Sequence, residues 1–162
     1  MYFRMINVCH RIFLLQDSSA FHVTIPLHIS LFSTGLKYLS KNRTVITISR
    51  DPFASLVIRQ IKGKFDSYIF KLGWGVRCFD HVSTPTLSIV VTGSNDKIVR
   101  VWNPVVTTKP IHLLSGHKSG INDVKIRDDK RLIFSYDKNA VLKIWDIDIG
   151  YCLQTMPLRF PR

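Results

Sequence analysis

The stretches "SNDKIVRVWNP" at residues 94–104 and "DKNAVLKIWDI" at residues 137–147 share one pattern. Each is a polar turn followed by a strand-like run of apolar residues that contains a tryptophan near its end. Trp102 and Trp145 are 43 residues apart, and Gly73 and Gly116 repeat the same spacing. Two independent landmarks agree on one period, so the chain is predicted to be a stack of one repeated unit.

The composition predicts β-structure. The chain has 162 residues and is 46% hydrophobic, which is enough for the core of one domain. All 11 acidic residues are aspartates. The absence of glutamate, together with many Val, Ile, Thr and Ser residues, disfavours long amphipathic helices. An all-β fold of strands joined by turns is expected.

The period of 43 residues, the Gly-His pair at 116–117 and the Trp-Asp pair at 145–146 resemble the WD-repeat (WD40) family of β-propellers. A degenerate copy precedes the other two, with Arg59 one period before Trp102. The resemblance implies an all-β partial propeller of about three four-stranded blades. The expected segments are an irregular or strand-like N-terminal segment at 1–40 and a propeller segment at 41–162, with repeats at about 41–72, 73–115 and 116–158.

The resemblance also places the strands, because each sequence repeat of this family supplies the outer strand of one blade and the three inner strands of the next. Outer strands are expected at 67–72 and 110–114, and innermost strands at 75–82 and 120–127. "SIVVTGS" and "RLIFSYD" are expected as second strands, and "IVRVWNP" and "VLKIWDI" as third strands. The strand-like stretch at 21–32 has no place in this pattern. Closing such a ring takes about seven blades, so the sequence predicts blades that join further blades, pair with another copy or are poorly stable.

In this family a hydrogen-bonded set ties each blade together, because a buried indole, hydroxyl or imidazole is costly without a partner. The set combines the His of the Gly-His pair, a Ser or Thr on the second strand, an Asp in the following turn and the Trp. Carried over to this sequence, it is Ser94, Asp96 and Trp102 in one copy, where Trp74 replaces the His, and Gly116, His117, Asn139, Trp145 and Asp146 in the other. An alternative alignment pairs Ser135 and Asp137 with Ser94 and Asp96 and requires a turn two residues longer. Whether Asp137 or Asn139 faces His117 stays open at this point.

Partners of the family usually dock on the face formed by the starts of the innermost strands and by the turns between second and third strands. Trp and Arg are residue types that often dominate the binding energy at interfaces. The partner-binding candidates are Trp74, Arg77, Lys97, Lys118, Asn122 and Lys138. An alternative gives Trp74 only a packing role at the position of the missing His.

No residue pattern predicts catalysis, a metal site or a cofactor. Ser94, Asp96 and His117 lack the strained GxSxG turn and the oxyanion hole that a nucleophilic triad requires. His22 and His28 are poorly spaced to share a metal, and no second cluster completes four ligands. Phosphate-binding glycine loops are also absent. A non-catalytic protein without cofactor or metal is expected.

The function expected from these features is a scaffold or adaptor that binds protein partners through a propeller surface. The net charge of +12 supports an alternative, a nucleic-acid-associated WD protein of RNA processing or ribosome assembly. The basic residues are scattered, however, and their densest cluster, at 125–131, is interleaved with aspartates. A solvated surface is therefore the favoured interpretation of the charge.

The cellular setting expected from the sequence is intracellular and cytoplasmic. Cys9, Cys78 and Cys152 are far apart and form no CxxC pair, which fits a reducing compartment. No apolar run reaches the ~18 residues of a membrane span. The motifs "GVRCFD", "VVTGSNDKIVRVWNP" and "LKIWDI" are similar to long WD-repeat proteins linked to cilia and testis, some with EF-hand regions. A ciliary location is therefore a further expectation.

Overall fold

The computed structural model describes residues 7–8, 11–16, 19–23, 33–39, 44–60 and 67–158. These residues form fifteen β-strands and one short 3-10 helix, Asp128–Lys130. Antiparallel pairing links the strands into three four-stranded sheets and one three-stranded sheet. The predicted all-β fold with three four-stranded units is therefore confirmed.

Each sheet is a meander in which strands consecutive in the chain are paired. The first sheet contains β4 (Ser33–Leu39), β5 (Thr44–Ser49), β6 (Leu56–Gln60) and β7 (Ser67–Phe70). The second sheet contains β8 (Cys78–Ser83), β9 (Ser88–Gly93), β10 (Val99–Trp102) and β11 (His112–Leu114). The third sheet contains β12 (Ile121–Arg127), β13 (Leu132–Asp137), β14 (Val141–Asp146) and β15 (Cys152–Pro157). The three-stranded sheet contains β1 (Asn7–Val8), β2 (Arg11–Gln16) and β3 (Ser19–Val23).

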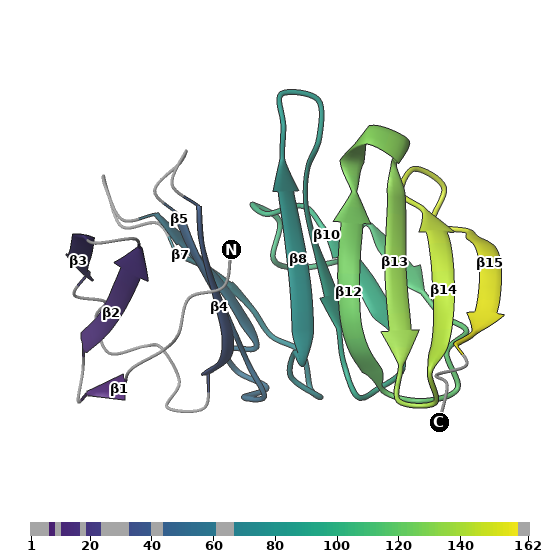
Figure 1. Ribbon diagram of the computed structural model, residues 1–162, viewed down its shortest axis with the longest axis horizontal. Helices are drawn as coiled ribbons and strands as arrows, with labels where there is room; N and C mark the ends of the chain where they lie inside the picture. The colour runs from purple at the N-terminus through teal and green to yellow at the C-terminus, as the bar shows by residue number, and fades with distance from the viewer. Residues whose placement is uncertain are drawn as a thin grey trace.

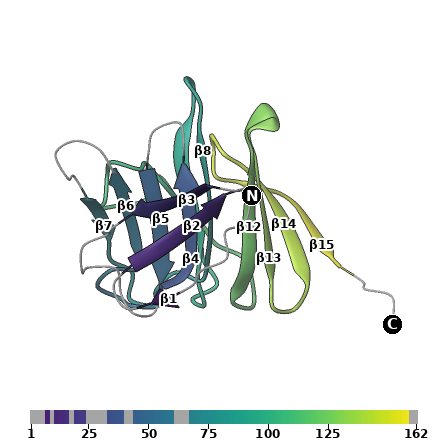
Figure 2. The same cartoon turned by 60° about the vertical axis from the view of Figure 1, so that its left-hand side comes forward.

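The three four-stranded sheets follow one another in chain order and do not close into a ring (Figure 1). Strands β1 to β3 lie beside the first sheet, and the third sheet is at the other end of the stack, as Figure 2 also shows. We call the face of a sheet that points to the following sheet its forward face, and the opposite face its back face.

The strands predicted for the second and third sheets are all present. The expected outer strands correspond to β7 and β11, and the expected innermost strands to β8 and β12. The degenerate copy supplies β5 and β6 of the first sheet. Its innermost strand, β4, comes from residues that the sequence places in the N-terminal segment. Of the strand-like stretch at 21–32, residues 24–32 lie outside the described residues.

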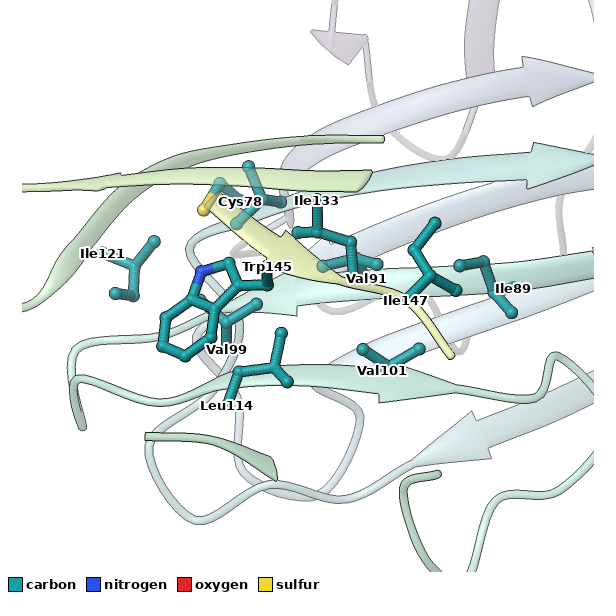
Figure 3. Packing of buried hydrophobic residues seen from close by; sticks show 11 residues of the cluster. Cys78, Ile89, Val91, Val99, Val101, Leu114, Ile121, Ile133, Trp145 and Ile147 are labelled. Atoms are coloured by element: carbon teal, nitrogen blue, oxygen red, sulfur yellow. The ribbon is translucent and has the colours of Figure 1, made fainter. Parts of the chain in front are cut away.

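Two apolar clusters hold the sheets together. Between the first and second sheets, the ring of Phe70 meets the ring of Trp102 edge-on, with centroids 5.1 Å apart. Between the second and third sheets, the cluster contains β-branched side chains and one indole (Figure 3): Val91, Val99, Val101, Ile121, Ile133 and Trp145. Because strand side chains alternate between faces, the second sheet contributes to both clusters. It presents Val91 forward and Val90 backward.

A largely buried aspartate links the innermost strands of all three sheets. Asp80 on β8 accepts a hydrogen bond from Lys37 Nζ on β4 at 2.7 Å and one from the Ile126 backbone N–H on β12 at 3.0 Å. Lys37 Nζ also donates to the backbone oxygen of His81 at 3.3 Å. Burial acts to raise the pKa of Asp80, but the bonds from Lys37 and Ile126 outweigh it and hold that pKa below its usual range.

Candidate interaction surface

The third sheet contains a buried hydrogen-bonded set. His117, which precedes β12, has Nδ1 3.1 Å from Asp137 Oδ2 and Nε2 2.7 Å from Ser135 Oγ. The Trp145 indole donates to the same Ser135 hydroxyl at 2.8 Å. With the proton assigned to Nδ1, the imidazole donates to the carboxylate and accepts from the hydroxyl. These bonds give the imidazole, the hydroxyl and the indole the partners that burial demands.

The charge state of this set follows from its surroundings. Burial lowers the pKa of His117, and Asp137 raises it by less. Burial acts to raise the pKa of Asp137, yet hydrogen bonds from the Val141 N–H, from His117 and from the Asn139 N–H bring it below its usual range. At neutral pH the set therefore contains a neutral imidazole beside a carboxylate. Its hydrogen bonds hold His117, which precedes β12, against the end of β13.

The acid that faces His117 is Asp137, so the assignment of this position to Asn139 is wrong. Asp137 is the last residue of β13 and points into the interior, whereas Asn139 is exposed in the following turn. The backbone N–H of Asn139 donates to Asp137 Oδ1 at 2.9 Å. Gly116 directly precedes His117 and is exposed. Asp146 ends β14, and its Oδ1 accepts the N–H groups of Asp148 and Ile149 in the next turn.

The second sheet has a reduced form of the set, and its hydroxyl is Thr92 rather than Ser94. The Trp102 indole donates to Thr92 Oγ1 at 3.0 Å, across the same ten-residue interval that separates Ser135 from Trp145. Trp102 is paired with Val90 on β9, and Thr92 lies two residues further along that strand on the same face of the sheet. The indole therefore reaches diagonally past Val90 to the Thr92 hydroxyl.

The two other polar residues assigned to this copy have different surroundings. Ser94 Oγ is buried without a hydrogen-bond partner among the described residues. Asp96 accepts the Ile98 N–H at 3.2 Å and Arg100 Nη2 at 2.6 Å. Asp96 therefore caps the turn and pairs with Arg100, a role different from that of Asp137 beside His117.

The alternative alignment names the right residues of the third sheet, Ser135 and Asp137, but the longer second turn that it requires is wrong. Gly93 pairs with Val99, and Tyr136 pairs with Leu142. The turns between these pairs, 94–98 and 137–141, contain five residues each. Ser94 and Asp137 therefore occupy the same position, and the second sheet has lost both the imidazole and the carboxylate of the set.

All six partner-binding candidates lie at one end of the sheets, which we call the loop end. It consists of the turns at 50–55, 94–98 and 137–141, of the segment at 71–77 that leads into β8, and of the segment at 115–122, which includes the first two residues of β12. Backbone hydrogen bonds of 2.8 to 3.0 Å join these segments: Val76 to Ser49, Arg77 to Gly93, Ile121 to Ser94 and Lys138 to Gly120. Backbone hydrogen bonds therefore fix the segments of the loop end to one another and to the ends of the strands.

Trp74 projects from this end. It is 69% exposed, so the alternative that it packs in place of the missing His is wrong. The next residue, Gly75, has φ +64°, and a Cβ atom there would lie 2.5 Å from Arg50 Cα. Only glycine permits both this backbone conformation and this approach to the neighbouring turn. The close contact fixes the segment that carries Trp74.

Three lysines surround the segment that enters β12. Lys97, Lys118 and Lys138 are exposed. Gly120 lies between their turns: a Cβ atom there would be 3.0 Å from Asn95 Oδ1 and 3.4 Å from Lys138 Cε. In the part of the chain that the structure describes, none of the three lysines forms an ion pair.

Arg77 and Asn122 are less available than the lysines, because both are half-buried. Asn122 Nδ2 lies 3.5 Å from the backbone oxygen of Asp137. Its Oδ1 is buried and has no hydrogen-bond partner in the described chain. Asn122 therefore faces the inside of the loop end more than its surface.

Two residues at the loop end were missed by the sequence reasoning. Phe53 is 75% exposed in the turn between β5 and β6, and Arg50 in the same turn is exposed as well. The available signal was an aromatic residue inside a polar turn, "RDPFAS", at 50–55. It was overlooked because this copy of the repeat has lost its Trp.

The family described as "WD40: WD domain, G-beta repeat" matches residues 67–103 and 108–146. The chain belongs to the WD40-repeat family. The matched residues contain the Trp102 to Thr92 and Trp145 to Ser135 hydrogen bonds.

Relatives of this WD40 chain include proteins named "WD repeat-containing protein on Y chromosome". The chain is 34% identical to the one from Drosophila ananassae over 86 residues, which is 53% of this chain and 8% of that protein. It is 37% identical to the one from Drosophila pseudoobscura pseudoobscura over 68 residues, 42% of this chain and 6% of that protein. The chain thus spans less than a tenth of the length of these relatives.

The described residues contain no group of three or more His, Cys, Asp or Glu side chains that could hold a metal ion. No helix among them is long and apolar enough to cross a membrane. Burial raises the pKa of the Cys78 thiol to about 12, so this thiol is not an activated nucleophile.

Proposed function

We propose that the chain is a non-catalytic scaffold segment that binds protein partners at the loop end of its WD40 sheets. The observation that supports this proposal is the combination of exposed aromatic side chains, Phe53 and Trp74, with lysines that form no ion pair among the described residues. Exposed aromatic residues often anchor partners, and the turns that carry Phe53 and Trp74 touch each other, since Gly75 packs against Arg50.

The charges at the loop end favour an acidic partner segment with an apolar anchor. Of the aspartates there, Asp137 is buried beside His117, Asp96 is paired with Arg100, and the half-buried Asp51 accepts the Phe53 N–H. The exposed cations are Arg50, Lys71, Lys97, Lys118 and Lys138. At the opposite end of the sheets, Arg127 pairs with Asp129 and Arg131 pairs with Asp148. The two further lysines there, Lys109 and Lys130, are matched in number by Asp128 and Asp146. The loop end is thus the basic end of the described chain.

Partner capture by proximity labelling with the full chain tests this function. The variant Trp74→Ser with Lys118→Ser is expected to lose most of the proteins that the natural chain labels. Lys109→Ser, an exposed lysine in the loop between β10 and β11 at the opposite end, is the matched control and should keep them. Equal labelling by all three chains would reject the loop end as the binding surface.

Nucleic acid is the second candidate partner, supported by the net charge of +12 and by the same exposed lysines. Phosphate contacts of this kind release counterions, so their affinity falls steeply with salt. RNA binding that persists at physiological salt and is lost in Lys97→Ser with Lys118→Ser would favour it. Binding that disappears at modest salt would leave the protein-partner proposal as the better one.

The remaining expectations stay proposals. They are the intracellular, cytoplasmic or ciliary location and the repeat boundaries at 41–72, 73–115 and 116–158. Imaging of the tagged full chain in ciliated cells checks the location. Limited proteolysis checks the boundaries, because cuts are expected between repeats before they occur within them.

A further inference from the structure

The exposed apolar side chains of the described chain gather in two segments. Of its ten exposed large hydrophobic residues, seven lie at 105–113 and 149–153. The first segment comprises most of the loop between β10 and β11 and the first two residues of β11. The second comprises part of the turn after β14 and the first two residues of β15. We call these two segments the apolar rim.

The two segments of the apolar rim touch each other, although they belong to different sheets. His112 Nε2 on β11 lies 3.1 Å from the backbone oxygen of Asp148. A Cβ atom on Gly150 would lie 2.8 Å from His112 Nδ1, so the turn after β14 lies directly against β11. The apolar rim is therefore one surface that joins the second and third sheets.

Strand β11 lies within this surface and forms an edge of its sheet. It pairs with β10, and no described strand pairs with its other side. Backbone N–H and C=O groups on such a side can bind a further strand, and proteins usually protect them with charged side chains. Strand β11 has the sequence HLL, and its central residue, Leu113, is 58% exposed. The edge therefore lacks the usual protection.

Both flanks of this free edge are apolar. Leu114 and His112 point to the forward face, where Leu114 joins the cluster with the third sheet and His112 meets the turn at 148–150. Ile149 in that turn is 69% exposed. Leu113 points to the back face, because side chains alternate along a strand. A strand added to β11 would thus place alternate side chains beside Leu113 and beside Ile149.

We propose that the free edge of β11 binds an extended strand of a partner protein. The added strand pairs with β11 through backbone hydrogen bonds, and its alternate apolar side chains cover the two flanks of the edge. This surface is separate from the loop end, so the inference goes beyond the proposed function.

The charge around β11 selects the kind of strand that binds. Residues 97–122 contain four lysine or arginine residues and no acidic residue. Two copies of the chain that pair through β11 would bring these positive segments together, and like charges on neighbouring strands are destabilising. A partner strand without lysine or arginine is therefore a better occupant than a second copy.

A defined peptide tests the proposal on the full chain. The probe is a short peptide in which valine and threonine alternate, with an aspartate at each end. Two further versions carry N-methyl groups on every second backbone nitrogen, in the two possible phases. Fluorescence anisotropy of the labelled peptides measures binding, and amide hydrogen exchange locates it.

Strand addition should slow the exchange of residues 110–115 several-fold. N-methylation in one phase should abolish binding and in the other phase should preserve it, because only alternate N–H groups of an added strand face its neighbour. Adhesion through apolar side chains alone would affect both versions equally. The two methylated peptides therefore separate backbone pairing from simple hydrophobic contact.

Variants of the chain locate the binding edge independently. Leu113→Lys should weaken peptide binding by about tenfold or more, because it places a charge on the edge. Ile69→Lys, at an exposed position of the outer strand β7, is the matched control and should bind as the natural chain does. Urea midpoints confirm that both variants are folded. Trp74→Ser with Lys118→Ser should also keep peptide binding, which separates this inference from the proposed function.

Three results would overturn the proposal. The first is exchange at residues 110–115 that the peptide does not slow. The second is equal binding of the two methylated peptides. The third is a dimer of the full chain, measured by light scattering, that Leu113→Lys dissociates. That result would assign the edge of β11 to a second copy of the chain.

Discussion

At the residue scale, the hydrogen-bonded sets show how a few polar atoms define a repeat that is otherwise apolar. Ser135 accepts from Trp145 and donates to His117, and His117 in turn meets Asp137. In the second sheet only the bond from Trp102 to Thr92 remains. The hydroxyl of Thr92 gives the buried indole its acceptor, and a buried N–H without one costs about 1–3 kcal/mol.

His117→Ala should lower the free energy of unfolding by about 2–4 kcal/mol, because it leaves the Asp137 carboxylate without its buried partner. Urea unfolding followed by tryptophan fluorescence measures the change. The matched control is Asn139→Ala, a substitution in the exposed turn that should change stability by less than about 0.5 kcal/mol. A larger effect at Asn139 than at His117 would contradict the assignment of the set.

Acidification should destabilise the chain through its buried imidazoles. Burial lowers the pKa of His81 to about 4, with Lys37 as the second cause, whereas an unfolded chain titrates near 6.5. Between these values the unfolded state binds a proton that the folded state does not, so the free energy of unfolding falls as the pH decreases from about 6.5 to about 4. Urea midpoints at pH 7, 5.5 and 4.5 measure the loss. His81→Gln should reduce it and leave the part due to His117, so an identical loss in both chains would refute this origin.

At the element scale, the segment that connects two sheets is as constrained as the strands. The turn at 73–76 leads from β7 to β8 while touching the turn after β5. Val76 donates its N–H to the backbone oxygen of Ser49 at 2.8 Å. The position of Trp74 therefore depends on a glycine and on a backbone contact more than on its own packing.

Gly75→Ala should destabilise the chain by about 1–3 kcal/mol, because a left-handed residue with a Cβ atom is strained and that atom would meet Arg50. Gly73→Ala is the matched control, since a Cβ atom at Gly73 would have nothing within 4 Å. Thermal unfolding of both variants, followed by circular dichroism, measures the difference. Similar melting temperatures for the two would show that the contact with Arg50 does not constrain this turn.

At the scale of the whole molecule, Asp80 joins three sheets that are otherwise held by apolar packing. Its carboxylate accepts hydrogen bonds from Lys37 Nζ of the first sheet and from the Ile126 N–H of the third sheet. Because the apolar clusters are not directional, polar contacts of this kind contribute to the register between innermost strands.

Asp80→Ala should lower the free energy of unfolding by about 2–4 kcal/mol, because it leaves a largely buried N–H group and a lysine without their acceptor. Asp123→Ala, one period later and 42% exposed, should cost less than about 1 kcal/mol in the same chain. Chemical unfolding of both variants gives the comparison. Equal costs would mean that Asp80 acts within its own strand and not between sheets.

The sequence alone predicted much of the fold, and for a physical reason. The period of 43 residues and the alternation of apolar residues before Trp102 and Trp145 depend on local chain geometry, which a sequence records directly. The strands of the second and third sheets could therefore be placed. The first sheet was harder, because Arg59 replaces its Trp and Lys37 of β4 replaces the aspartate found at positions 80 and 123.

Which polar groups meet was decided by the tertiary structure alone. An indole reaches diagonally across a sheet, so Thr92 and Ser135, rather than Ser94, are the hydroxyls that receive it. Asp137 faces His117 because it ends a strand whose alternation points it inward, a matter of register and not of residue type. The exposure of Trp74 and Phe53 and the link through Asp80 likewise exist only once sheets are stacked, since they depend on which surfaces the neighbouring sheet covers.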